Sequence, residues 1–376
     1  MLTVEHLNTQ VSQQVERFVE LPYRLYADHP QWVPPFRQDE TLLLNRQGHF
    51  IHKNFEVDFL LVRRDEQDVG RIAVMLPRHD DQPEGRREAR FALFDCTDDT
   101  EAAVLLFDRA ITWARERGAT RIFGPNRLMF LDGDGILIEG FAYPQVMYMT
   151  PYNYPYYAKL IEAAGFEKDL DFLSSHIDVT SSVKMPDWIQ TMATWVQQKG
   201  NVRIQSFDTI EALLEALPQL IAVLQKALVQ NQSVETASDD ALSFAVQHAL
   251  KIGIDPQLIK TILNDDVIVG VVLAFPNLST VCQRLKGEFD QSALRQAIND
   301  APGIVFNGFG ILPEFQLQGF QALLFAEIEK TIHATNVQTL NIIQIAETTG
   351  RMKNDMLALG ITPTQIHRRY TRTLDR

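Results

Sequence analysis

Residues 311–322 read Ile-Leu-Pro-Glu-Phe-Gln-Leu-Gln-Gly-Phe-Gln-Ala and are the most informative stretch of the sequence. The residues just before, 303–312, predict a strand, and residues 320–335 predict a helix. The stretch is therefore a strand–loop–helix junction, with Gly319 directly before the helix. Free backbone N–H groups and the helix dipole at such a junction form an anion site.

The same order of elements is predicted twice along the chain. The first half reads as a hairpin (55–76), a strand (89–96), a helix stopped by Gly118, a strand (120–124), a short helix (156–164) and a strand (172–179). The second half reads as a hairpin (259–275), a strand (303–312), a helix (320–335), a strand (340–346), a short helix (352–359) and a strand (366–373). Asp98 and Glu101 predict a capping box at the start of the first long helix. Residues 1–35 read as helix punctuated by prolines.

A local echo accompanies this order: QDVGRIAV at 67–74 against VIVGVVLA at 267–274. The fold class that follows is α/β, with two domains in tandem, each a central mixed β-sheet flanked by helices. We expect the domains at 1–180 and 203–376, with a linker at 181–202. The length of 376 residues suits two domains.

Composition and charge exclude several classes of protein. The chain has a net charge of -13, which disfavours nucleic-acid binding. Two cysteines provide neither a disulfide framework nor a four-ligand zinc site, and Asp132-Gly133-Asp134-Gly135 lacks the glutamate of a calcium loop. No apolar run approaches the roughly 20 residues of a membrane span, and the first residues lack a signal-peptide pattern. We expect a cytoplasmic protein with no metal and no membrane partner.

Residues 311–322 resemble the pyrophosphate signature of the GNAT superfamily of acyl-CoA-dependent N-acyltransferases, Gln/Arg-x-x-Gly-x-Gly/Ala. Gln316 and Gly319 match this pattern, whereas Gln321 stands where glycine or alanine is usual. The resemblance implies acetyl-CoA or another acyl-CoA as co-substrate. It would be bound through the backbone at Leu312, Gln316, Leu317, Gln318, Gly319, Phe320, Gln321 and Ala322.

The first half lacks this signature, because Asp98, Asp99 and Glu101 stand at the start of its helix. Carboxylates there cap the helix and would repel a pyrophosphate. We therefore expect the first half not to bind CoA in the manner of the family. Segments 21–26, 32–35, 140–141 and 151–157 also resemble a group of bacterial GNAT-like proteins, but this resemblance implies no substrate.

The catalytic residues usual in the family are not at their usual places. The family's tyrosine acid, four residues before a glycine, is replaced by Met356 in the second half and Ile161 in the first. Glu347, at the end of a predicted strand, is the candidate base, and Tyr370, in the last strand, the candidate acid. A solvated carboxylate and a packed aromatic are the more common readings of these two residues.

Three further residues are candidates for contact with substrate. Asn307, with Gly308 and Gly310, interrupts a strand and predicts a β-bulge, for a ligand or for shape alone. Asn153 and Tyr156 lie in a segment, 143–157, that holds six of the nine tyrosines. Such a segment suits a ligand pocket, although packing or an interface is favoured.

The leading hypothesis is acetyl transfer from acyl-CoA to an unknown small-molecule or peptide amine. One alternative is a catalytically silent binding or scaffolding protein derived from this fold. A second is a Fem-like transferase that uses aminoacyl-tRNA, because those enzymes also pair two such domains. The acidic charge balance speaks against tRNA.

Overall fold

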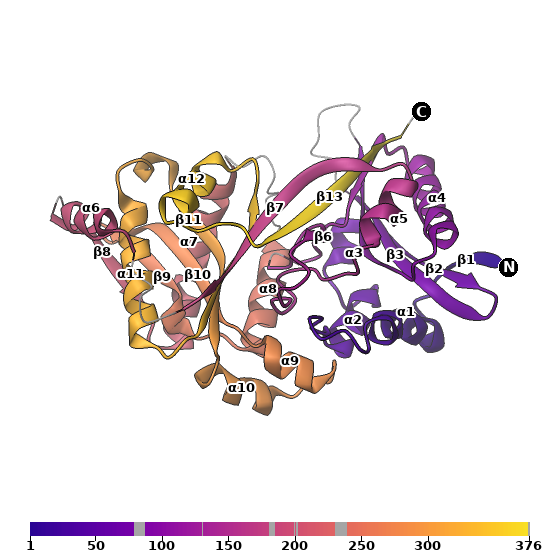
Figure 1. The fold of residues 1–376 in the computed structure, drawn as a ribbon, viewed down its shortest axis with the longest axis horizontal. Coiled ribbons are helices and arrows are strands. Elements are labelled where there is room, and N and C mark those ends of the chain that lie inside the picture. Colours follow the sequence, from indigo (N-terminus) through magenta and orange to yellow (C-terminus); the bar gives the residue numbers. More distant parts are fainter. Residues whose placement is uncertain are drawn as a thin grey trace. The chain divides into compact units, whose positions relative to one another are not determined.

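The computed structural model describes residues 1–78, 87–129, 131–179, 185–198, 200, 202–229 and 239–374. The chain forms two compact units, and neither is a single continuous segment (Figure 1). Unit 1 comprises Met1–Leu173, Cys282–Asp290 and Gln365–Arg376, and unit 2 comprises Ser174–Val281 and Gln291–Thr364. Each unit therefore contains a strand from the other half of the sequence.

Unit 1 contains the order of elements that the sequence predicts for the first half. A strand and three helices precede this order. Its elements are β1 (Leu2–His6), α1 (Ser12–Leu25), α2 (Arg37–Leu44), α3 (Ile51–Asn54), β2 (Phe55–Arg64), β3 (Gln67–Pro77), β4 (Glu88–Cys96), α4 (Thr100–Glu116), β5 (Arg121–Gly124), β6 (Ile136–Glu139), α5 (Tyr157–Ala163) and β13 (Gln365–Thr373). The strand β7 (Glu167–Asp178) begins in unit 1 and ends in unit 2.

Unit 2 repeats this order. Its elements are α6 (Asp187–Gln198), β8 (Val202–Ser206), α7 (Ile210–Val229), α8 (Asp239–Ile252), the 3-10 helix η1 (Pro256–Leu258), β9 (Lys260–Asn264), β10 (Val267–Pro276), α10 (Gln291–Asn299), β11 (Gly303–Ile311), the 3-10 helix η2 (Pro313–Phe315), α11 (Phe320–Ala334), β12 (Thr339–Ala346) and α12 (Gly350–Ala358). Helix α9 (Ser279–Leu285) begins in unit 2 and ends in unit 1.

The sheet of each unit is mixed. In unit 1 the strand order is β1-β2-β3-β4-β5-β13, with β6 also on β13, and only β4 and β5 are parallel in this set. In unit 2 the order is β8-β9-β10-β11-β12, and here β11 and β12 are the parallel pair. The predicted α/β class, with a central mixed sheet flanked by helices in each unit, is confirmed.

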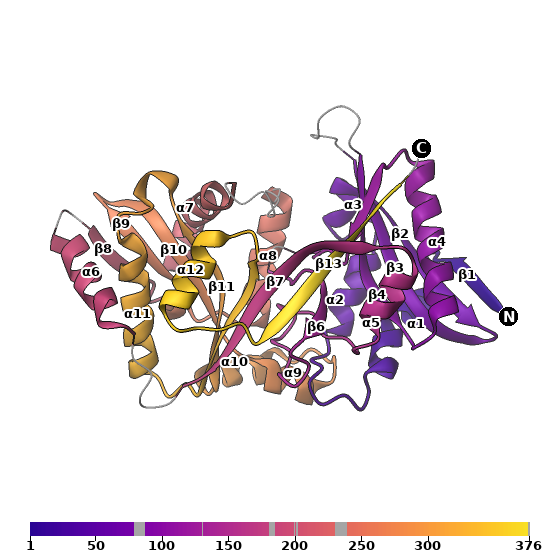
Figure 2. The same cartoon turned by 45° about the horizontal axis from the view of Figure 1, so that its top comes forward.

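Both faces of each sheet are covered, because side chains alternate between the faces along a strand. In unit 1, Leu60 and Val62 pack in the core that contains α4, whereas Phe59 and Leu61 pack with Phe18 of α1. Figures 1 and 2 show α4 and α1 on either side of β2 and β3.

In unit 2, helices α7 and α11 cover different faces of β11. A Cβ at Gly310 would lie 2.9 Å from Ala227 of α7. The neighbouring Phe309 stacks instead on Phe325 of α11, with ring centroids 5.6 Å apart.

Most predicted elements are present, with three corrections. Residues 1–35 begin with a strand, because Leu2–His6 pairs with β2. The four-residue strand β6 lies in a stretch for which no element was predicted. The cap of α4 is one residue later than predicted, since the Asp99 side chain accepts a hydrogen bond from the N–H of Ala102 at 3.1 Å. Residues 181–184, 199 and 201 of the predicted linker lie outside the described residues, as does residue 180.

Candidate functional site

Two parallel strands of unit 2 separate part-way along their length. The pairing of β11 with β12 runs from Gly303 with Thr339 to Phe306 with Ile342. Both strands continue past this point, β11 to Ile311 and β12 to Ala346. Beyond Phe306 and Ile342, the facing backbone groups of the two strands are therefore not paired with each other, and an extended ligand can bond with them.

A β-bulge lies where the strands separate. Val272 of β10 is opposite Phe309, but Ala274 is opposite Phe306, so β11 has one extra residue between them. The extra residue falls at Asn307 and Gly308, which confirms the predicted bulge. A bulge bends its strand and ends regular pairing, and this accounts for the separation from β12.

The loop that follows β11 leads into α11 through two left-handed residues. Leu317 has φ +62° and Gly319, the N-cap of α11, has φ +84°. A Cβ at Gly319 would lie 2.7 Å from the sulfur of Met192 in α6, so only glycine fits without a shift. No acceptor in the described chain reaches the N–H groups of Phe320 and Gln321. The start of α11 therefore presents unpaired N–H groups suited to an anion.

Other residues of the predicted cofactor loop have internal partners. The N–H of Leu312 donates to Val269 O at 2.9 Å, so it is not available to a ligand. The side chain of Gln316 donates to Ile311 O at 2.9 Å, and that of Gln318 to Glu314 O at 2.6 Å. Phe320 and Ala322 are buried, and the exposed side chain of Leu317 projects from the loop. These bonds fix the loop shape before any ligand arrives.

The two predicted catalytic residues belong to different units. Glu347 lies in unit 2, half-buried in the turn after β12. Tyr370 lies in β13 of unit 1, almost fully buried, and its hydroxyl donates to Glu162 at 3.1 Å. Burial raises the pKa of Tyr370 above its ordinary value, so the phenol stays neutral. Their roles as base and acid stay predictions.

Unit 1 contains the same strand geometry. Its parallel pair, β4 with β5, ends at Arg90 with Phe123, and a register shift falls at Leu93, which has φ +50°. The N–H of Thr97 donates to Val69 O at 2.9 Å, as Leu312 does to Val269 in unit 2. The echo of 67–74 and 267–274 therefore marks equivalent positions in the two units.

Acidic side chains stand at the start of helix α4 in unit 1. Asp99 caps α4, and Arg64 binds its carboxylate through two hydrogen bonds of 2.7 and 2.8 Å. This hydrogen bonding lowers the pKa of Asp99, which stays ionised. Asp99 and Glu101 stand where Gly319 and Gln321 stand at the start of α11. A pyrophosphate would meet two carboxylates here.

Tyrosines occupy the end of β4. The hydroxyl of Tyr156 donates to Cys96 O at 2.9 Å, and the N–H of Cys96 donates to the hydroxyl of Tyr157 at 3.2 Å. Tyr26 donates to the same Tyr157 hydroxyl at 2.6 Å. The backbone N–H and C=O of Cys96 are therefore not available to an extended ligand. Burial also raises the pKa of the Cys96 thiol to about 12, so Cys96 is no nucleophile.

Asn153 is likewise engaged within unit 1. Its amide accepts from the N–H of Leu137 at 2.7 Å and donates to Leu137 O at 3.0 Å and Tyr154 O at 3.0 Å. The residue is buried, and these bonds hold the tyrosine-rich segment to β6. This arrangement gives Asn153 and Tyr156 structural partners, and substrate contact by either stays a prediction.

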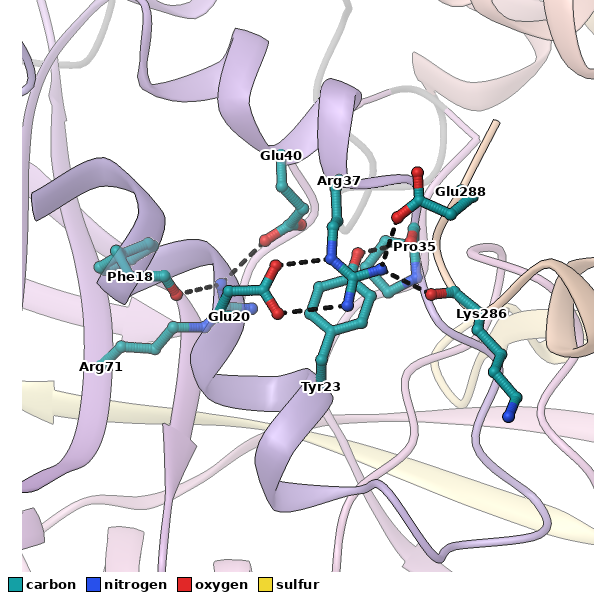
Figure 3. Close-up of polar contacts among 9 residues, drawn as sticks. All are labelled: Phe18, Glu20, Tyr23, Pro35, Arg37, Glu40, Arg71, Lys286 and Glu288. Carbon is teal, nitrogen blue, oxygen red and sulfur yellow. Dashed lines mark hydrogen bonds and ion pairs between the residues drawn. The ribbon is translucent and has the colours of Figure 1, made fainter. Parts of the chain in front are cut away.

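A buried arginine that sequence reasoning missed supports the tyrosine cluster. Arg71 of β3 donates to Asp95 at 2.8 Å. It also donates to Glu40 at 2.8 Å and to Phe18 O at 3.1 Å (Figure 3). Asp95 in turn accepts from Tyr157 at 3.3 Å. Arg71 and Asp95 pair across β3 and β4 at the positions of Val271 and Gly310 in unit 2. The sequence does contain a signal for this ion pair, because Arg71 and Asp95 are charged residues among mostly apolar neighbours in two strands.

A second arginine in Figure 3 binds the segment Cys282–Asp290 of unit 1. Arg37 donates to Lys286 O at 2.6 Å and to Glu20 at 2.5 Å, and its guanidinium lies 3.8 Å from the centroid of the Tyr23 ring. A Cβ at Gly287 would lie 2.4 Å from the Tyr23 ring. Tyr23, in the segment 21–26, and Arg37 thus pack against residues 286–288.

Arg37 and Glu20 also border an open cavity of about 950 Å³ between α1 and α2. Glu16 and Arg46 line it as well. No group of three or more metal-ligating side chains occurs among the described residues. None of the helices in that part of the chain has the length and apolar character of a membrane span.

No model of a known protein family matches the chain. The chain is 29% identical over 277 residues to the bacterial ceramide synthase of Caulobacter vibrioides (strain NA1000 / CB15N), over 73% of this chain and 70% of that protein. It is 23% identical over 374 residues to Protein YghO of Escherichia coli (strain K12), over 96% of this chain and 93% of that protein.

Solved structures share the fold of the whole chain. A tandem GNAT protein from the clavulanic acid biosynthesis pathway has a TM-score of 0.57 at 14% identity, covering 100% of this chain and 99% of that one. A GCN5-related N-acetyltransferase from Sphaerobacter thermophilus has a TM-score of 0.52 at 11% identity, covering 100% and 96%. The chain has the tandem GNAT fold, which confirms the fold that the resemblance in the sequence implied.

Proposed function

We propose that this tandem GNAT-fold protein is an acyl-CoA-dependent N-acyltransferase whose acyl-CoA site lies in unit 2. The observation that carries the proposal is the separation of β11 from β12 at a bulge, followed by unpaired N–H groups at the start of α11. The pantetheine arm would bond with the free edge of β11. The pyrophosphate would sit at Gly319, Phe320 and Gln321.

The reaction would join an amine nitrogen to the acyl carbon and break the carbon–sulfur bond. The nitrogen lone pair forms the new bond, and the electrons of the broken bond leave with the sulfur. The amine loses a proton to a base, and the thiolate gains one, which gives an amide and free CoA. Glu347 is the candidate base in unit 2.

The relative from Caulobacter suggests the class of acceptor. A ceramide is the N-acyl derivative of a long-chain amino alcohol, so such an amine is the first acceptor to test, with a long-chain acyl-CoA beside acetyl-CoA. We expect a small-molecule amine rather than a nucleic acid as partner. Two free, buried cysteines and an acyl-CoA donor suit a cytoplasmic location.

The test is a turnover assay on the full chain. Acetyl-CoA and palmitoyl-CoA are each mixed with sphinganine in detergent micelles, and released thiol is followed with a chromogenic disulfide. Mass spectrometry then identifies the N-acyl product. We expect amine-dependent CoA release and the matching amide. Failure of every donor to bind or react would contradict the proposal.

A silent binding protein is the second candidate, because Met356 occupies the position of the family's tyrosine acid and is buried. The two functions separate in the same experiment. A binding protein would bind acyl-CoA and release no thiol with any amine, whereas an enzyme would do both.

A further inference from the structure

Three polar residues lie on neighbouring strands of unit 2 where β11 and β12 separate. Asn341 of β12 is opposite Val305 of β11, one residue before the pairing ends. Asn307 lies two residues beyond Val305 along β11, in the bulge. His176, from the part of β7 in unit 2, has its Nδ1 2.9 Å from Oδ1 of Asn341.

This polar row faces away from α11. Ile304, Leu340 and Ile177 belong to the apolar cluster that contains Ile332 of α11. Because side chains alternate along a strand, Asn341 and His176 point to the other face. The start of α11, proposed to hold the pyrophosphate, and the polar row therefore lie on different faces of the separated strands.

One amide atom of Asn341 lacks a hydrogen-bond partner among the described residues. The residue is 3% exposed, and its Nδ2 has no hydrogen-bond partner within the described part of the chain. Whichever amide atom faces His176, the other remains buried and unpaired. An unpaired buried polar group is unfavourable, and a ligand that bonds with it would remove that penalty on binding.

We propose that Asn341, with Asn307 beside it, binds the acceptor amine, and that His176 is a positioning residue that fixes the Asn341 amide. This inference rests on the proposed acyl transfer and names the acceptor subsite of the same reaction. An amine suits the site when the amide oxygen of Asn341 faces it and the amide N–H groups face His176. The amine N–H can then donate to that oxygen, and the lone pair stays free to attack the acyl carbon. The amine would thus reach the acyl carbon from the face opposite α11.

The test uses the full chain and its Asn341→Leu variant, which keeps a similar volume without polar atoms. We expect the KM for sphinganine to rise about 10- to 100-fold, as expected for one buried hydrogen bond. The affinity for palmitoyl-CoA should stay within twofold. His176→Phe should raise the same KM less, and His176→Gln, which keeps a donor, should restore most of it. Asn264→Leu, at the end of β9, is the matched control.

Direct binding separates this inference from the proposed function. Titration calorimetry with octylamine, in the presence of CoA, measures amine binding without turnover. If amine binding needs Asn341 but no acylation occurs, the subsite stands and the proposed function fails. An unchanged KM and unchanged octylamine affinity in Asn341→Leu would overturn the subsite, as would equal losses of palmitoyl-CoA and amine binding.

Discussion

The hydroxyl of Tyr157 lies 3.2 Å from the backbone nitrogen of Cys96, at the end of β4 in unit 1. In unit 2 the equivalent residue is Ile311, at the end of β11, since Cys96 and Ile311 pair with Gly70 and Gly270. Unit 1 thus has the strand geometry on which the proposed acyl-CoA site of unit 2 rests, but its own tyrosine side chains bond with the backbone of Cys96. We therefore expect unit 1 not to bind acyl-CoA.

One acyl-CoA should therefore bind per chain. Removing the tyrosine hydroxyls in Tyr156→Phe and Tyr157→Phe should not create a second site, because Asp99 and Glu101 still face the helix start. Calorimetric stoichiometry measures this, and a value near two for wild type would contradict it. Each variant should also lose about 1–3 kcal/mol of stability if a buried group is left unpaired.

Gly319→Ala should weaken both stability and acyl-CoA binding. A Cβ at this φ of +84° is strained and would meet Met192, so the loop must shift away from its present course. We expect a loss of about 1 kcal/mol or more in unfolding free energy and a several-fold rise in the Kd for acyl-CoA. Gly350→Ala, at a helix start with open space around it, is the matched control. Equal effects at both glycines would contradict the account.

Asp132 should make stability depend on pH. Burial raises the pKa of this carboxyl to about 7, and its Oδ1 has no partner among the described residues. Because the native pKa exceeds the unfolded one, the native state binds more protons between about pH 4 and 7, and stability falls as pH rises through that window. Each rise of one pH unit in this window lowers the free energy of unfolding by up to about 1.4 kcal/mol.

Asp132→Asn removes this titration, so the melting temperature of the variant minus that of wild type should increase from pH 5 to pH 8. Thermal unfolding at both pH values measures the difference. Parallel changes with pH in the two proteins would show that Asp132 ionises freely in the native state.

Arg71→Met should destabilise unit 1 strongly. Removing the guanidinium leaves the carboxylates of Asp95 and Glu40 without their cation, and breaking a buried ion pair costs about 3–5 kcal/mol. The double variant Arg71→Val with Asp95→Gly, which copies Val271 and Gly310 of unit 2, should recover part of the loss. Chemical denaturation of the three proteins measures this. A double variant no more stable than Arg71→Met would contradict the equivalence.

The local sequence pattern predicted the helices and strands, but it did not predict which unit each strand belongs to. The hairpins, the long helices and the bulge at Asn307 follow from spacing and from glycine, because these are local properties. The assignment of β13 to unit 1 depends on pairing with β5, about 250 residues earlier in the chain, and no local pattern encodes it. The short strand β6 and the strand β1 were missed for the same reason.

The candidate site was predicted in part. The loop 312–319 has a sequence signature, so its place before α11 could be read directly. His176 and Asn341 carry none, since they meet only where β7 lies beside β12. The tyrosines of 143–157 were visible as a cluster, yet their bonds to Cys96 and Tyr26 required the fold.

The most direct test of the central claim is titration calorimetry of palmitoyl-CoA with wild type and Gln321→Glu. Glutamate at this position copies Glu101 of unit 1 and suits a helix start, so the variant should fold while repelling a pyrophosphate. We predict one site per chain in wild type, a Kd at least tenfold weaker in Gln321→Glu, and no loss in the control Gln321→Gly. Binding that is unchanged in Gln321→Glu would contradict an acyl-CoA site at the start of α11.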